Sequence, residues 1–184
     1  HPFSELVEQA RTGFITKLFK KYVVPMEVHE HDTFVDWTSF ACEMLRREMI
    51  DDIGMLDDGF FMYYEDVDYC FRANNSGWTV KHVPSAEAVH LRGGSSNVKS
   101  NNINKTRQPK YLYQSRSRIF YKCYGQLGLL LANLCWIMGR AVALTRLAFG
   151  NRRSRGVKKQ GRDIWINFLD PCGDYTHPSG DINE

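Results

Sequence analysis

Three carboxylates stand close together in the first half of the chain, directly after a run of aromatic residues and Met. They are Glu65, Asp66 and Asp68, and the preceding run is Phe-Phe-Met-Tyr-Tyr at residues 60–64. A carboxylate beside bulky apolar groups binds its proton more tightly than one in water, because burial disfavours the charged form. A raised pKa suits a general base that works near neutral pH. This trio is the best indication of chemistry in the sequence.

A histidine follows the carboxylates along the chain. His90 ends a strand-like run and precedes the turn-forming sequence Gly93-Gly94-Ser95-Ser96. Histidine is a common metal ligand, so the residue is a candidate for a metal or phosphate contact. It also fits an ordinary hydrogen-bonded histidine of a strand. Likewise, Asp66 fits a plain carboxylate at the positive end of a helix. The residues alone leave both alternatives open.

The charges divide the chain into an acidic first part and a basic second part. The 184 residues hold 24 Lys and Arg against 21 Asp and Glu, a net charge of +3. Residues 88–162 contain 16 of the Lys and Arg and no acidic side chain. Such a stretch favours a polyanionic partner. Its cations alternate with Leu, Trp and Phe and match no nucleic-acid motif, so we expect an anionic membrane surface and no nucleic acid. A solvated cationic surface is the alternative.

The composition is that of one globular domain. Hydrophobic residues make up 43% and aromatic residues 13% of the chain, enough for a core. The five cysteines are widely spaced and form no C-x-x-C pair, which disfavours a disulfide framework or a zinc ribbon. Reduced thiols in a reducing compartment are the simpler interpretation. The chain begins at His1 without a signal-type apolar run, so we expect a piece cut from a longer protein and no secretion.

Hydrophobic spacing predicts the elements that position the carboxylates. A helix should begin near Glu65, because Val67, Cys70 and Phe71 then share one face, and Gly77 is a natural residue to end it. Before this helix we expect an amphipathic helix over 4–22 capped by Ser4, a polar linker over 25–32, a strand over 34–45 and a short helix over 46–53 that Gly54 ends. After it we expect strands over 78–83 and 86–91, a flexible loop over 97–108 and a helix from about Tyr111.

The most apolar window covers residues 126–139. It is shorter than the roughly 20 residues that a membrane span needs, it contains Gln126 and Asn133, and Arg140 closes it. With residues 141–149 added, it fits a basic amphipathic helical pair that lies in a membrane surface. It fits a buried helical hairpin equally well. A transmembrane helix is a third alternative.

Several short motifs follow one another in a fixed order. They are Val35-Asp36-Trp37, residues 60–68, Arg72, Gly77-Trp78, Val83-Pro84, Ala88-Val89-His90 and Gly94-Ser95-Ser96. This order resembles the C-terminal half of family 2 glycosyltransferases, and in particular the bacterial rhamnosyltransferase-like members that build cell-surface polysaccharides. The combined pattern carries the resemblance, which covers residues 4–149.

The resemblance implies an α/β fold of the GT-A type, in which a nucleotide-binding half precedes an acceptor-binding half. Residues 1–110 would form the acceptor-side half, an α+β-like fragment with a few strands flanked by helices. Amphipathic, membrane-associated helices would follow over 111–150, and a basic, then polar tail over 151–184. The implied reaction moves a sugar such as rhamnose from a nucleotide-sugar donor to a lipid-linked or cell-surface glycan, with inversion. It would take place at the cytoplasmic side of the cell membrane.

The resemblance also assigns roles to residues. Asp66 would be the base that deprotonates the acceptor hydroxyl, with Glu65 beside it. His90 would complete the site of a divalent cation, Mg or Mn. The residues expected to contact substrate are Trp37, Asp68, Arg72, Gly94 and Ser95. Trp37 would line the sugar pocket, although a core position fits it as well. Arg72 would orient the carboxylates or meet the diphosphate.

The family's first half, with its D-x-D metal motif, is not in this chain. Asp66-Val67-Asp68 satisfies D-x-D by letter, but it opens a helix where the family's motif closes a strand. We therefore expect the fragment alone to be inactive, and its exposed apolar surface to favour self-association. Two other classes stay open: a non-catalytic basic module that docks to membranes, and a metal-dependent hydrolase built on the carboxylate trio and His90. The hydrolase lacks a second ligand cluster.

Overall fold

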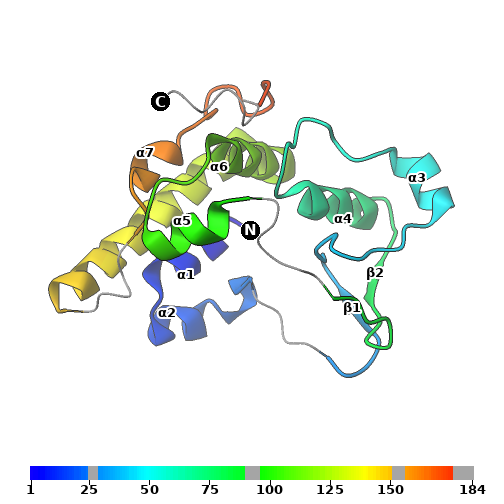
Figure 1. The fold of residues 1–184 in the computed structure, drawn as a ribbon, viewed down its shortest axis with the longest axis horizontal. Coiled ribbons are helices and arrows are strands. Elements are labelled where there is room, and N and C mark those ends of the chain that lie inside the picture. Colours follow the sequence, from blue (N-terminus) through cyan, green and yellow to red (C-terminus); the bar gives the residue numbers. More distant parts are fainter. Residues whose placement is uncertain (25–28, 90–95, 151–155, 176–184) are drawn as a thin grey trace.

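The computed structural model describes residues 1–24, 29–89, 96–150 and 156–175. One long helix, α6, runs through the molecule, and shorter helices pack along it (Figure 1). The elements in chain order are α1 (Pro2–Ala10), α2 (Gly13–Leu18), the 3-10 helix η1 (Lys20–Tyr22), β1 (Thr33–Val35), α3 (Arg47–Ile53), α4 (Glu65–Asn75), β2 (Val80–His82), α5 (Val98–Asn104), α6 (Lys110–Ala148) and α7 (Gln160–Asp163).

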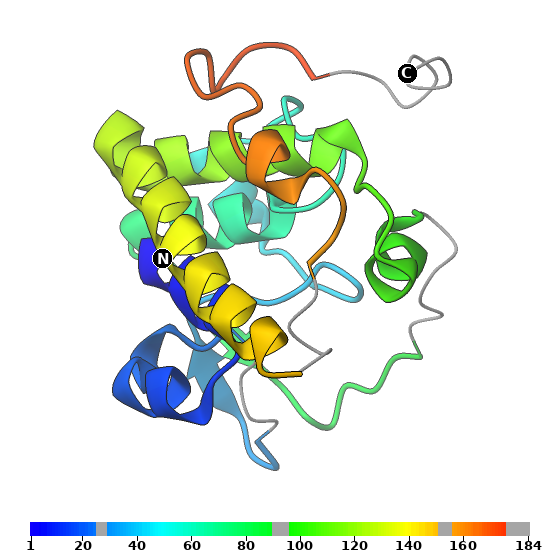
Figure 2. The ribbon, with the colours of Figure 1, turned by 90° about the vertical axis from the view of Figure 1, so that its left-hand side faces the viewer.

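Helix α6 consists of two arms. Gly125 interrupts it with φ 66° and ψ −173°, a conformation that glycine adopts at low cost. Figure 2 shows the arm of residues 110–124 meeting the arm of residues 126–148 at a marked angle. The predicted division into one helix over 126–139 and a second over 141–149 is therefore wrong. Residues 126–148 form one continuous arm, and the bend lies before them.

Helix α1 packs against the second arm of α6. The contact is close at Gly139, where an added Cβ would lie 2.8 Å from both the Leu6 carbonyl oxygen and the Gln9 Cβ. A buried ion pair fixes the same region: Arg116 Nε donates to Glu5 Oε1 at 2.8 Å, and Arg116 Nη1 donates to Asn133 Oδ1 at 2.7 Å. These three residues come from α1 and from the two arms of α6, so one cluster joins all three segments.

A second cluster of charges holds α4 on the first arm of α6. Asp68 is 1% exposed and forms ion pairs with Arg72 Nε at 3.0 Å and Lys122 Nζ at 2.7 Å. The same ammonium group lies 2.6 Å from Asp57 Oδ2, and Arg118 Nη2 lies 2.8 Å from Asp57 Oδ1. Because Lys122 bridges two carboxylates, the loop before α4 and the helix itself are tied to one point of α6.

The sheet is small and antiparallel. β1 pairs with β2 in the register Thr33↔His82, Phe34↔Lys81 and Val35↔Val80. The prediction of a strand over 34–45 is wrong beyond Val35. Only three residues of β2 offer hydrogen-bond partners, so the strand ends there. The chain then leaves the sheet and passes α4, where Asn74 Nδ2 donates to the Asp36 carbonyl oxygen at 2.8 Å. The predicted strand over 86–91 is also wrong for residues 86–89, and its remainder lies outside the described residues.

Two other predictions are wrong for local reasons. The single helix expected over 4–22 breaks at Arg11, which adopts φ 50°, and Thr12 then caps α2 by accepting from the Ile15 amide at 3.1 Å. The first helix is capped by His1 and not by Ser4. Residues 97–108 contain the helix α5, although a flexible loop is expected there. The side chain of Asn101 holds its C-terminal end by bonding to Thr106 and to the Arg107 carbonyl oxygen.

The remaining elements agree with the sequence analysis. Helix α3 ends at Gly54, which has φ 77° and donates its amide to the Ile50 carbonyl oxygen. Helix α4 begins at Glu65 and is followed by Gly77 with φ 86°. The strand predicted over 78–83 and the helix predicted from Tyr111 are present as β2 and α6. The structure thus confirms the predicted elements whose ends are marked most clearly in the sequence.

Removal of the Asp57 charge tests the second cluster. Burial alone would raise the pKa of Asp57, but hydrogen bonds from Arg118 and Lys122 outweigh it and hold the pKa below its ordinary value of 3.8. The stabilisation is present above pH 3.8 and is lost as the pH falls towards the lower folded-state pKa. We expect Asp57→Asn to reduce the free energy of unfolding at pH 7 by about 2 kcal/mol in urea denaturation.

The matched control is Asp51→Asn, because Asp51 pairs with Arg47 at the surface, where the two side chains are 60% and 83% exposed. This variant should lose less than about 0.5 kcal/mol. The difference between wild type and Asp57→Asn should also shrink below pH 4. Equal losses in the two variants would contradict the assignment.

Candidate functional site

A strained turn leads into α4. Tyr63 and Tyr64 have φ values of 71° and 70°, in the left-handed region that bulky residues rarely adopt. Such a residue costs about 1–3 kcal/mol and persists where the surroundings enforce it, often at a functional site. Here Ser115 on α6 donates to the Met62 carbonyl oxygen at 3.1 Å and helps to fix the turn. The strain therefore lies directly before Glu65 and Asp66.

Glu65 and Asp66 are half-buried at the first turn of α4. Burial raises the pKa of Asp66 above its ordinary value, against the opposing effect of the Val67, Asp66 and Phe40 backbone amides. Burial also raises the pKa of Glu65, and the neighbouring charge of Asp66 adds to this. Among the described residues, the buried Oε2 of Glu65 has no hydrogen-bond partner. Two carboxyls of raised proton affinity therefore lie side by side, one with an unused acceptor oxygen.

The segment that follows β1 passes over this turn. The Phe40 amide lies at the Asp66 carboxyl, and the Thr38 amide lies at the Cys70 thiol. The Phe40 ring packs edge-on against Tyr69 with 5.8 Å between the ring centres. Trp37 belongs to the same segment and is half-buried. The structure thus brings the segment of Trp37 to the start of α4, and a direct sugar contact of Trp37 stays a prediction.

Asp68 and Arg72 face the protein and not an open site. Arg72 donates from Nη1 to the Ile53 carbonyl oxygen at 2.7 Å and from Nη2 to the Met55 carbonyl oxygen at 2.9 Å. Its third nitrogen pairs with Asp68, and its guanidinium lies 4.8 Å from the centre of the Tyr69 ring. These contacts give both residues a role in positioning α4 and the chain before it. Their expected contact with substrate stays a prediction.

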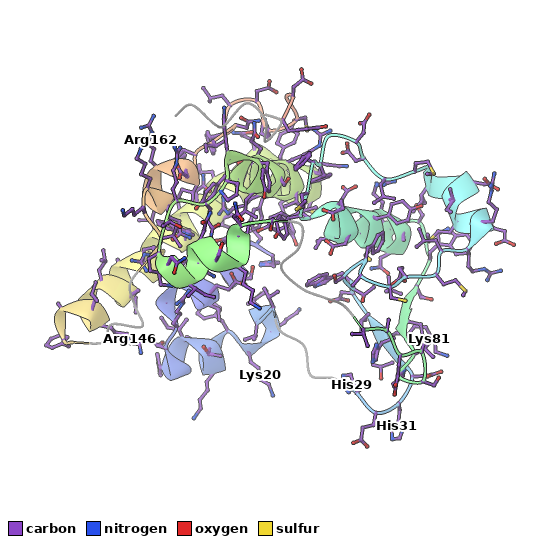
Figure 3. The ribbon with its side chains drawn as sticks, in the orientation of Figure 1. Lys20, His29, His31, Lys81, Arg146 and Arg162 are labelled. Atoms are coloured by element: carbon purple, nitrogen blue, oxygen red, sulfur yellow. The ribbon has the colours of Figure 1, made fainter. Side chains whose placement is uncertain are left out.

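The other predicted site residues, His90, Gly94 and Ser95, lie outside the described residues. Within residues 1–24, 29–89, 96–150 and 156–175, no group of three His, Cys, Asp or Glu side chains could hold a metal ion. His29 and His31 are exposed on the segment before β1, at the outer edge of the molecule (Figure 3). The described residues therefore offer a base candidate but no complete site for a divalent cation.

Sequence reasoning missed the residues that hold the base candidate in place. Lys122, Arg118 and Asp57 link α4 to α6, yet the two cations are far from the carboxylates along the chain. One signal was present: Arg118 and Lys122 are four residues apart, which places both cations on one face of a helix. The acidic partners of this face cannot be identified without the fold.

Part of the chain matches curated proteins of one reaction class. It is 40% identical over 62 residues to the N-acetylglucosaminyl-diphospho-decaprenol L-rhamnosyltransferase of Mycobacterium tuberculosis, covering 34% of this chain and 20% of that protein. It is 34% identical over 70 residues to the rhamnosyltransferase WbbL of Escherichia coli, covering 38% and 26%. This chain is related to glycosyltransferases. A third relative, the low-salt glycan biosynthesis hexosyltransferase Agl10 of Haloferax volcanii, is 32% identical over 56 residues, covering 30% and 18%.

The glycosyltransferase relationship is confined to a short segment. The match spans about a fifth to a quarter of the length of these relatives. No family model matches the chain, and no solved structure matches it. The relationship therefore supports the transfer of a sugar in general, whereas the donor, the acceptor and the GT-A fold need separate evidence.

The raised pKa of Asp66 leads to a stability prediction. A carboxyl whose pKa is raised in the folded state contributes stability below its ordinary pKa of 3.8, and this contribution is lost as the pH rises through the folded-state value. Asn is neutral and avoids this loss. We expect Asp66→Asn to raise the free energy of unfolding at pH 7 by about 0.5–1 kcal/mol, with the gain disappearing towards pH 4. Urea denaturation at both pH values measures this difference in the free energy of unfolding. The exposed Asp58→Asn is the control, and its free energy of unfolding should equal that of the wild type. A loss of stability at pH 7 would contradict the assignment.

Proposed function

We propose that this chain is the acceptor-side portion of an inverting glycosyltransferase of the GT-A type. It would move a sugar such as rhamnose from a nucleotide-sugar donor to a membrane-associated or cell-surface glycan acceptor. The observation that carries the proposal is the pair Glu65 and Asp66, which a strained turn presents at the start of α4 with raised proton affinity. The similarity to rhamnosyltransferases supports the reaction class.

In the proposed mechanism, Asp66 removes the proton of an acceptor hydroxyl. The hydroxyl oxygen attacks the anomeric carbon from the face opposite the nucleoside diphosphate, which leaves with its electron pair, so the configuration inverts. Burial strengthens Asp66 as a base because it raises the proton affinity of the carboxylate. The Val67 amide donates to Asp66 Oδ1 at 2.8 Å and fixes its direction.

The donor side of the reaction needs residues beyond the described ones. The resemblance predicts a nucleotide-binding half and a divalent cation, Mg or Mn, with His90 as a candidate ligand. The carboxylates at the start of α4 do not complete a metal site, because Asp68 is paired with Arg72 and Lys122. We therefore assign binding of the nucleotide sugar to the upstream half and deprotonation of the acceptor to this chain.

Substitution of Asp66 tests the proposal. In the chain extended by its nucleotide-binding half, we expect Asp66→Asn to reduce sugar transfer by about 10²–10⁴-fold, because the general base is lost. Release of nucleoside diphosphate in the presence of acceptor measures the rate. The exposed Asp58→Asn serves as the control and should keep the wild-type rate. If Asp66→Asn turns over at a near-normal rate, Asp66 is not the base.

A second candidate function is that of a module that docks to anionic membranes without catalysis. One observation favours it: an exposed apolar stripe on the second arm of α6, formed by Leu127, Leu131, Leu134 and Met138, which are 80%, 40%, 46% and 58% exposed. Helix α6 is long and apolar enough to cross a membrane by length and composition, but 44% of its most apolar window is buried in the protein. A helix that lies on a membrane surface accounts for both facts.

Vesicle binding tests this candidate. We expect the chain to co-sediment with vesicles that contain anionic lipid and to dissociate at high salt, because Lys20, Arg146 and Arg162 are spread over the outside of the molecule (Figure 3). Leu127→Glu combined with Leu134→Glu should weaken binding about tenfold, whereas Leu169→Glu, at a residue that is 92% exposed outside the stripe, should not. Equal binding of both variants would exclude the stripe. Absence of sugar transfer in the extended chain would favour the docking module over the enzyme.

A further inference from the structure

A polar cavity of about 220 Å³ lies between α1, α5, α6 and α7. Four cations line it, Arg11, Lys105, Arg116 and Arg140, against the two carboxyls of Glu5 and Glu8. Tyr64, the residue before α4, forms part of its wall. The cavity therefore adjoins the strained turn at Tyr64, and its lining carries a net positive charge.

Three buried polar atoms of this lining have no hydrogen-bond partner among the described residues. They are Gln108 Oε1, the Tyr113 hydroxyl and Arg116 Nη2, in residues that are 7%, 4% and 4% exposed. A buried polar group without a partner costs about 1–3 kcal/mol, and more if it is charged. All three residues line the same cavity, so molecules bound in it can supply the missing partners. Water and a polar ligand are the two classes that can do so.

The charges around the cavity favour an anion. Arg116 uses Nε on Glu5 and Nη1 on Asn133, and its buried Nη2 has no partner among the described residues. Burial and the nearby charge of Arg11 both lower the pKa of Arg140, so two guanidinium groups repel one another here. Desolvation and the charge of Glu5 also raise the pKa of Glu8 to about 6, which weakens the negative charge of the lining at mildly acidic pH and so makes its net charge more positive. A lining of four cations and two carboxyls therefore favours an anion over a neutral molecule.

We infer that this cavity binds a phosphate-bearing ligand. Phosphate oxygens would accept from Arg116 Nη2 and the Tyr113 hydroxyl within the field of the surrounding cations, and a ligand hydroxyl or a bound water would donate to Gln108 Oε1. The volume corresponds to about seven water molecules. This is enough for a phosphate or diphosphate group but not for a whole nucleotide sugar. The inference does not depend on the proposed sugar transfer.

Calorimetry on the 184-residue chain tests the inference directly. Inorganic phosphate, pyrophosphate and farnesyl diphosphate are titrated separately, with rhamnose as an uncharged probe. We expect at least one of the phosphate compounds to bind at one site per chain and rhamnose not to bind. Affinity for farnesyl diphosphate at least about tenfold above that for pyrophosphate indicates a lipid-linked source. Equal affinity indicates a soluble phosphate compound. Absence of saturable binding by all three phosphate compounds overturns the inference.

Substitution of Tyr113 locates the binding site. The Tyr113 hydroxyl has no partner in the described structure, so Tyr113→Phe should fold with unchanged or higher stability and bind the phosphate ligand about tenfold more weakly. Arg140→Gln at the cavity should weaken binding by a similar factor. The controls are Tyr121→Phe and Arg162→Gln, whose residues are exposed and do not line this cavity. If Tyr113→Phe and Arg140→Gln bind as tightly as the controls, the ligand lies elsewhere and the cavity holds water.

Discussion

The guanidinium of Arg116 is the point on which the arrangement of helices depends. It is buried in the first arm of α6 and bonded to Glu5 of α1 and to Asn133 of the second arm, with the Phe120 ring 5.0 Å away. A charge in the interior is tolerated only while its partners are in place, because an unpaired buried charge is strongly destabilising. The docking of α1 and the angle at Gly125 are therefore coupled. If either segment moved away, the buried Arg116 guanidinium would lose one of its hydrogen-bond partners.

A second set of ion pairs connects α6 to α4, the helix that begins with the candidate base. Lys122 lies between Asp57 and Asp68, and Arg72 continues from Asp68 to the carbonyl groups of Ile53 and Met55. Helix α4 is thus held from inside the protein by Asp68 and Arg72, whereas Glu65 and Asp66 take part in none of these ion pairs. The residues that perform the proposed chemistry differ from those that position them. This separation allows the two carboxyls to keep a raised pKa, because the stabilising cations contact Asp68 and not Asp66.

The sequence predicts the start of α4, its end before Gly77 and the short helix that stops at Gly54, because glycine and the spacing of apolar residues act locally. The strand expected over 34–45 shows the limit of this reasoning: its composition suits a strand, but a strand needs a neighbour, and β2 offers three residues. The bend at Gly125 is hidden because helical spacing continues on both sides of it. The roles of Asp68 and Arg72 depend on Lys122 and on the loop at Ile53, which only the fold brings together.

The chain between β1 and α3 has a consequence for how such a protein could diversify. Outside the three paired residues of β1, this stretch is irregular, and single contacts hold it over α4, such as the bond from Asn74 to the Asp36 carbonyl oxygen. The ion pairs beneath α4 do not include it. Insertions or exchanges at the exposed positions of this stretch could therefore accumulate without breaking those ion pairs. Under the proposed function, new acceptor preferences would arise from changes in this stretch between β1 and α3, while Asp66 keeps its place.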